Sequence, residues 1–163
     1  MKLYHGSTIT IEHPLAHVGR QHLDFGQGFY LTNIESQASD WAKKVKLVKK
    51  SPTAIINIFD FDYQSTIDAG YKYLCMDEYN KEWLDFITKS RKGLKPWYGY
   101  DFIEGGVAND RVIDTVEDYM IGRITAEQAL GQLKYTKTNH QICILNQEKI
   151  DKYLMFIESK ELY

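Results

Sequence analysis

Two short stretches of the chain carry the residue types that could hold a flat ligand. The first is Gly26-Gln27-Gly28-Phe29-Tyr30, in which two glycines precede an aromatic pair. Glycine lets a second backbone or a planar ligand approach closely, and neighbouring residues of a strand point to opposite faces. One ring can therefore enter a core while the other faces a cleft. The second stretch is Leu3-Tyr4-His5-Gly6-Ser7, and we expect the two stretches to lie side by side.

The predicted strands and helices around these two stretches determine where they lie. Residues 2–5 and 29–31 have the pattern of short strands, and the loop over 7–24 between them is long enough to be functional. Thr32 and Glu35 have the spacing of a capping box at the start of a helix. The apolar residues that follow recur at helical spacing and are expected in the core; they are Ala38, Trp41, Ala42 and Val45.

The rest of the chain mixes further strands and helices. Thr125 and Gln128 form a second capping-box pair, at the start of a late helix. Gln141 and Cys143 share one face of an alternating segment. The pattern has no regular βαβ rhythm, which favours an α+β fold in a single domain over residues 1–163. The other predicted strands cover 53–61, 100–105 and 153–158, and the other helices cover 77–92 and a segment capped by Asn109 or Asp110 that ends at 120.

Composition limits the classes to which the protein can belong. The chain has 163 residues, of which 44% are hydrophobic, and a net charge of −2, so nothing draws the whole molecule to nucleic acid or acidic membranes. Cys75 and Cys143 show neither metal spacing nor a disulfide framework, which fits a reducing compartment. With no signal peptide and no long apolar run, we expect a cytoplasmic protein without a membrane partner. His13, His17 and His22 lack metal-ligand spacing, so no metal site is expected.

Three motifs together resemble the ADP-ribosyltransferase superfamily. They are His5-Gly6-Ser7 after an apolar strand, Gly-x-Gly-Phe-Tyr at 26–30, and Ala-x-x-Trp-Ala at 38–42. The similarity is greatest to the branch with a His-Tyr-Glu triad, which includes diphtheria-toxin-like and poly-ADP-ribose-polymerase-like enzymes. Nearly the whole chain also resembles a bacterial family known as domain of unknown function 3990, through Leu3–Ser7, Asp24–Thr32, Val107–Asp110 and His140–Ile142.

This resemblance implies a fold, a ligand and roles for individual residues. The implied fold is two packed antiparallel sheets flanked by helices, with NAD in the cleft between them. His5 would hydrogen-bond a ribose hydroxyl, Gly6 would hold the nicotinamide carboxamide through its main chain, and Tyr30 would stack on the ring. The third triad position falls on Gln141. The implied NAD-binding set is His5, Gly6, Ser7, Gly28, Phe29 and Tyr30.

The implied activity is mono-ADP-ribosyl transfer from NAD to a protein or nucleic-acid acceptor, with release of nicotinamide. Small bacterial members of the superfamily resemble toxins or defence effectors, so an antitoxin or regulatory partner is a further expectation. Asn109 and Asp110 could line the acceptor side or simply cap a helix. If the acceptor is a nucleic acid, the lysines between Lys43 and Lys50 could form the electrostatic footprint together with Lys89, Arg91 and Lys92, although such a lysine-rich helix face is more often only solvated.

Gln141 departs from the pattern of the branch. Cleavage of the nicotinamide–ribose bond develops positive charge on the sugar, which a carboxylate normally stabilises. The amide of Gln141 can accept a hydrogen bond but supplies no negative charge and no general base. Three hypotheses remain: Gln141 orients NAD in a slow enzyme; Asp24, Glu104 or Asp110 supplies the charge; or the protein is a non-catalytic module that binds NAD, ADP-ribose or a protein partner.

Overall fold

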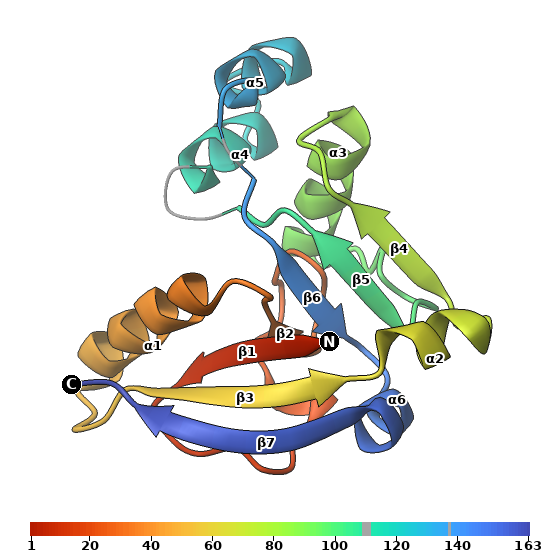
Figure 1. Ribbon diagram of the computed structural model, residues 1–163. Coiled ribbons are helices and arrows are strands. Elements are labelled where there is room, and N and C mark those ends of the chain that lie inside the picture. Colours follow the sequence, from red (N-terminus) through yellow and green to blue (C-terminus); the bar gives the residue numbers. More distant parts are fainter. Residues whose placement is uncertain (109–111, 137) are drawn as a thin grey trace.

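A computed structural model describes residues 1–108, 112–136 and 138–163 (Figure 1). The described part contains two β-sheets and six α-helices. None of its helices combines the length and the apolar character that crossing a bilayer requires. In chain order the elements are β1 (Lys2–Ser7), η1 (Ala16–Val18), β2 (Phe29–Leu31), α1 (Glu35–Lys49), β3 (Ile55–Phe61), α2 (Tyr63–Asp68), β4 (Tyr73–Met76), α3 (Lys81–Arg91), β5 (Phe102–Gly105), α4 (Ile113–Met120), α5 (Ala126–Leu133), β6 (Gln141–Ile144), α6 (Gln147–Tyr153) and β7 (Leu154–Glu161).

The two sheets confirm the α+β class. The first has the order β1-β3-β7 and is antiparallel throughout. The second has the order β2-β6-β5-β4, and its β4–β5 pair is parallel. The expectation of two purely antiparallel sheets was therefore wrong at this edge. The reason is the connection: α3 lies between β4 and β5, and a crossover of this kind returns the chain in the direction that parallel neighbours need.

The main core lies between the two sheets. It contains Phe29 and Leu31 of β2, packed with Phe59 of β3, Phe102 of β5 and Ile142 of β6. Burying these apolar side chains from both sheets supplies the main driving force for packing one sheet on the other. The residue between Phe29 and Leu31 points to the opposite face of β2, as the alternation of the sequence predicts.

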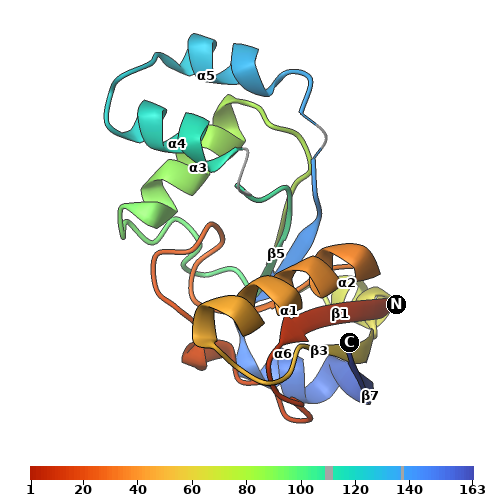
Figure 2. The same cartoon turned by 90° about the vertical axis from the view of Figure 1, so that its left-hand side faces the viewer.

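A second core covers the outer face of the four-stranded sheet. Helices α3, α4 and α5 gather there, apart from α1, β1 and β3 (Figure 2). Trp83 of α3 is fully buried, and its indole Nε1 donates a 2.7 Å hydrogen bond to the carbonyl of Gly106. The predicted capping box of Thr125 and Gln128 is present at the start of α5. On this face the helices bury Ile103 of β5 and Cys143 of β6.

Helix α1 packs on the three-stranded sheet through two small residues. Ala38 and Ala42 are buried, whereas Trp41 between them is 43% exposed, so the expectation that Trp41 belongs to the core was wrong. Because the helix lies close to β1, the two alanines occupy the middle of its buried face. The Trp41 indole lies at the side of that face, partly in solvent. The expected capping box of Thr32 and Glu35 is also absent, because the Thr32 backbone pairs with β1 and its hydroxyl accepts a bond from the Ile34 N–H.

Gly6 of β1 is the position that permits this close approach. A Cβ atom at Gly6 would lie 2.2 Å from the carbonyl oxygen of Ala38 and 2.9 Å from the amide nitrogen of Ala42. We expect Gly6→Ala to lower the free energy of unfolding by about 1–3 kcal/mol, as other overpacked positions do. Gly131→Ala in α5, where no atom lies within 4 Å of the new methyl group, is the control and should stabilise slightly. Equal midpoints of urea unfolding for the two variants would contradict the packing argument.

Candidate functional site

The two stretches singled out in the sequence meet where β1 and β2 diverge. Tyr4 and Thr32 exchange two backbone hydrogen bonds, of 2.8 Å and 3.0 Å. The next pair in this register is Gly6 and Tyr30, and no hydrogen bond between their main chains is found in the described part of the chain. The two strands therefore touch at one bridge and then separate. We call the space between the edges of β1 and β2 at Gly6 and Tyr30 the seam.

The main chain of Gly6 presents a donor and an acceptor to the seam. In an antiparallel pair the residues alternate between bonding the partner strand and pointing away from it. Tyr4 lies opposite Ile58 of β3 but bonds β2 through both its N–H and its C=O, so Gly6, two residues on, points both groups to the same edge. Gly6 is buried, and a ligand must reach it along the seam. An adjacent N–H and C=O match the two ends of a primary carboxamide.

His5 lies beside the seam as a neutral imidazole. Its Nδ1 donates a 2.7 Å hydrogen bond to the carbonyl of Tyr30, so in the neutral ring Nε2 is an acceptor. No hydrogen bond to Nε2 is found among the residues described. The ring stacks on Phe29 with centroids 4.5 Å apart, which fixes its plane. Burial lowers the pKa of His5, and the bond to the Tyr30 carbonyl only partly opposes that shift.

This depressed pKa has a consequence for stability. The unfolded chain takes up a proton at His5 near pH 6.5, whereas the folded protein resists that proton. The stabilising contribution is therefore complete above about pH 6.5 and is lost as the pH falls below that value. We expect the free energy of unfolding of His5→Gln to decline less steeply than that of the wild type between about pH 6.5 and pH 5. Parallel curves in urea titrations would show that His5 is not held neutral.

Tyr30 offers a ring but no free hydroxyl. The phenol donates a 2.7 Å hydrogen bond to the carbonyl of Gly26 and accepts one of 3.1 Å from the Phe25 N–H. Burial raises the pKa of Tyr30 well above its usual value, so the hydroxyl stays protonated. The residue as a whole remains partly exposed. Its hydroxyl end is thus fixed inside the fold, while its backbone carbonyl holds His5.

Gln141 lies on the same face of the sheet as Tyr30. Tyr30 is opposite Cys143, so Gln141, two residues earlier on β6, is its diagonal neighbour across the strands. The Gln141 side chain is partly exposed and has no hydrogen bond to another described residue. The start of β6 is tied to α1, because the Gln37 amide bonds the carbonyl of His140 at 3.1 Å and its N–H at 3.4 Å. Three elements therefore converge beside Gln141.

The remaining residues of the implied NAD set have packing explanations. The Ser7 hydroxyl accepts a 3.4 Å bond from the Ile9 N–H at the end of β1. A Cβ atom at Gly28 would lie 2.5 Å from the Cys143 sulfur, so glycine is needed there for the approach of β6. Phe29 is 6% exposed and belongs to the core. Gly28 and Phe29 therefore support the site through packing and do not face the seam.

The acidic candidates are engaged elsewhere. Asp24 is 5% exposed, and its two oxygens bond Arg91 at 2.5 Å and the Ala108 N–H at 2.7 Å. Burial raises the pKa of Asp24, and the charge of Arg91 opposes the shift. Asn109 and Asp110 lie outside the described residues. Helix α4 begins at Ile113, with Val112 at its N-cap.

Glu104 is on β5 opposite Ile142, and Gln141 is opposite Gly105, so the two side chains leave opposite faces of the sheet. Burial raises the pKa of Glu104, but the hydrogen bonds to the carboxylate outweigh it and the net shift is downward. The carboxylate is bonded to three side chains, those of Tyr63, Tyr73 and His140. Neither Asp24 nor Glu104 is therefore free to take the place of a triad glutamate beside Gln141.

Trp41 is a candidate site residue that the sequence pattern did not indicate. It is on the turn of α1 between Ala38 and Ala42, the residues that contact Gly6. The Arg20 guanidinium lies 5.8 Å and the Lys44 ammonium 5.9 Å from the centroid of its ring. Helical spacing does not distinguish a tryptophan in the core from one at the edge of the apolar face, because both positions fit the same helical period.

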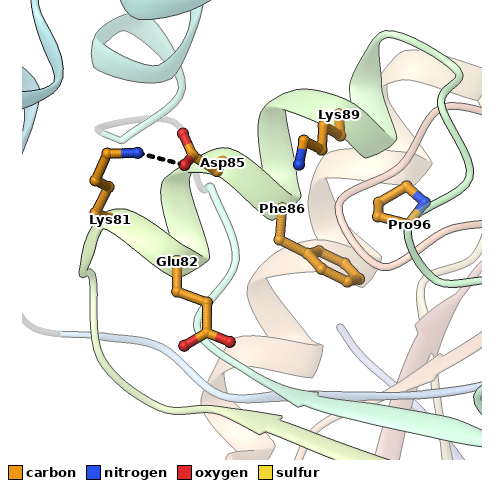
Figure 3. A pocket seen from close by; sticks show the side chains of 6 residues that line it. All are labelled: Lys81, Glu82, Asp85, Phe86, Lys89 and Pro96. Atoms are coloured by element: carbon orange, nitrogen blue, oxygen red, sulfur yellow. Dashed lines mark hydrogen bonds and ion pairs between the residues drawn. The ribbon is translucent and has the colours of Figure 1, made fainter.

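Two surface depressions lie away from the seam. One of about 440 Å³ follows α3, where Lys81 and Asp85 form a 2.6 Å ion pair (Figure 3). The other, of about 940 Å³, lies between α2, α6 and the facing ends of β3 and β7. Neither is lined by His5, Tyr30 or Gln141. The seam is instead an edge between two strands, and it is the chemistry of its groups that marks it as a candidate site.

Comparison with known proteins agrees with the pattern of the sequence at the level of family. A family model described as "Protein of unknown function (DUF3990)" matches residues 1–156. No curated protein and no solved structure matches the chain.

Proposed function

The chain belongs to the DUF3990 family, and starting from this membership and the seam we propose that it is a mono-ADP-ribosyltransferase. It cleaves NAD, releases nicotinamide and transfers ADP-ribose to a macromolecular acceptor. The observation that carries the proposal is the main chain of Gly6, whose N–H and C=O face the seam next to His5, the residue whose Nδ1 bonds the Tyr30 carbonyl. The seam thus presents two groups that suit the nicotinamide carboxamide and one that suits a ribose hydroxyl.

In this proposal two aromatic side chains, those of Tyr30 and Trp41, cover the nicotinamide ring. The Tyr30 ring is held by its hydroxyl, and Trp41 lies partly exposed on the α1 turn that contacts Gly6. Flat faces of this kind bind an aromatic ring mainly by burying its surface. Arg20 and Lys44 beside the indole supply positive charge for the diphosphate of NAD.

The reaction breaks the bond between the ribose C1′ and the nicotinamide nitrogen. The electron pair of that bond leaves with nicotinamide, which becomes neutral, and the sugar carries the positive charge. A nucleophile of the acceptor then bonds to C1′ and loses its proton to solvent. Gln141 accepts a hydrogen bond from a ribose hydroxyl and so orients the sugar. Without a carboxylate at this position the sugar cation is less stabilised, and a slow enzyme is expected.

A non-catalytic NAD-binding module is the second candidate. It is favoured by Gln141 together with the engagement of Asp24 by Arg91 and of Glu104 by its three partners. In this case the same seam holds NAD or ADP-ribose without bond cleavage.

Titration with NAD in a thermal-shift assay, followed by a nicotinamide-release assay, separates the candidates. Binding with release supports the enzyme, and binding without release supports the module. Absence of binding at millimolar NAD would refute both. Labelling of a cell lysate with a tagged NAD analogue then distinguishes transfer, which leaves a labelled macromolecule, from simple hydrolysis, which does not.

A further inference from the structure

We infer that the buried ion pair of Asp24 and Arg91 is a positioning element for Tyr30 and His5, although neither of its members reaches the seam. The structural part of this inference stands on its own, and its effect on NAD turnover rests on the proposed function.

The C-terminal end of α3 holds the chain just before Phe25. The Arg91 Nε lies 2.5 Å from the Asp24 Oδ1, and the neighbouring Ser90 hydroxyl donates a 2.6 Å bond to the carbonyl of Leu23. The other oxygen of Asp24 accepts the 2.7 Å bond from Ala108. The Asp24 side chain is 6% and the Arg91 side chain 22% exposed, so solvent screens the pair little. Residues 23–24 are therefore fixed by two neighbouring helical residues and by the chain after β5.

The turn that follows residues 23–24 links them to the side chain of Tyr30. The Gly26 N–H bonds the carbonyl of Leu23 at 3.1 Å and closes the turn, with Gly26 at φ 88°. A Cβ atom on Gly26 would lie 2.4 Å from the Trp97 ring, so the turn is also packed from outside. The Phe25 N–H and the Gly26 carbonyl then hold the Tyr30 hydroxyl from two sides.

The last step leads from Tyr30 to His5. The Tyr30 carbonyl accepts the Nδ1–H bond of His5, which selects the tautomer that leaves Nε2 as an acceptor. Each step from Arg91 to His5 is a direct bond or a covalent neighbour. A buried ion pair adds little net stability compared with apolar packing, but it specifies one geometry. Removing one partner also leaves the other charge buried and unpaired, so variants of this pair are expected to lose stability as well as to displace Tyr30 and His5.

The test reads the His5 ring directly. In ¹⁵N-labelled protein, the ring nitrogens of His5, assigned by their loss in His5→Gln, should show a single neutral tautomer with Nδ1 protonated. We expect Arg91→Met to shift these signals toward a mixture of tautomers, and the milder Arg91→Lys to shift them less. Asp85→Asn is the matched control, because it removes the exposed 2.6 Å pair with Lys81 on the same helix. It should leave the His5 signals unchanged.

An unchanged His5 signature in folded Arg91→Met would overturn the inference, and if that variant does not fold, an unchanged signature in Arg91→Lys has the same meaning. In the nicotinamide-release assay, Arg91→Lys should lower kcat about 10-fold or more, with a smaller change in KM, since small misplacements near the reacting centre cost up to about 100-fold. If the wild type releases no nicotinamide, the proposed enzyme fails, and the ring-nitrogen signals still decide the structural inference.

Discussion

Replacing His5 by alanine is expected to lower nicotinamide release from NAD by at least about 100-fold, the range found when one positioned polar group is removed from a reacting centre. The change removes the Nε2 acceptor and also the 2.7 Å bond that fixes the Tyr30 carbonyl. The measurement is chromatographic quantitation of nicotinamide under single-turnover conditions.

His17→Ala is the matched control for this experiment. His17 is exposed in η1, and only its backbone carbonyl takes part in a described hydrogen bond, from the Gln27 amide. The variant should therefore release nicotinamide at the rate of the wild type. Full activity in His5→Ala would place the reacting ribose away from the seam and would remove the main support for the proposed function.

Gln141→Glu is expected to raise the rate of nicotinamide release by about 10- to 100-fold. A carboxylate diagonal to Tyr30 would place a full negative charge near the developing sugar cation, where electrostatic stabilisation is commonly worth that much. Gln141→Ala should lower the rate, because it removes the amide oxygen that orients the ribose. Initial rates at saturating NAD, compared for the three proteins, test both statements.

Gln132→Glu in α5 controls for the added charge. Its Oε1 accepts a 2.9 Å bond from the Thr115 hydroxyl, and a carboxylate can accept the same bond, so the fold should be unaffected and the rate unchanged. If Gln141→Glu binds NAD and still releases no nicotinamide, the non-catalytic module becomes the better description of the protein.

The sequence predicted the parts of the fold that depend on local pattern. Alternation placed Phe29 and the following tyrosine on opposite faces, and the pair Thr125 and Gln128 marked the start of α5. Prediction from the sequence failed where contacts between distant segments determine the local structure. Thr32 has the spacing of a helix cap, but the bridge to Tyr4 takes its backbone. The short elements α2, β4 and α6 were not predicted, because few residues give no clear period.

The same limit applies to the candidate site. The sequence singled out His5 and Gly6, but only the strand register shows that the Gly6 N–H and C=O turn toward β2. Register also separates Glu104 from Gln141, which are on adjacent strands and leave opposite faces. Which acid lies near a ribose is thus a question of pairing between distant segments, and residue types alone do not answer it.

The seam between β1 and β2 also affects how the molecule as a whole would respond to its ligand. Among the residues that the structure describes, one backbone bridge, between Tyr4 and Thr32, joins the two sheets. An amide bound to Gly6 would occupy the place of the missing peptide unit and extend the hydrogen-bonded ladder from one sheet toward the other. A bound ligand would then link the two sheets reversibly through hydrogen bonds. Slower deuterium uptake at the Gly6 and Tyr30 amides would report this link.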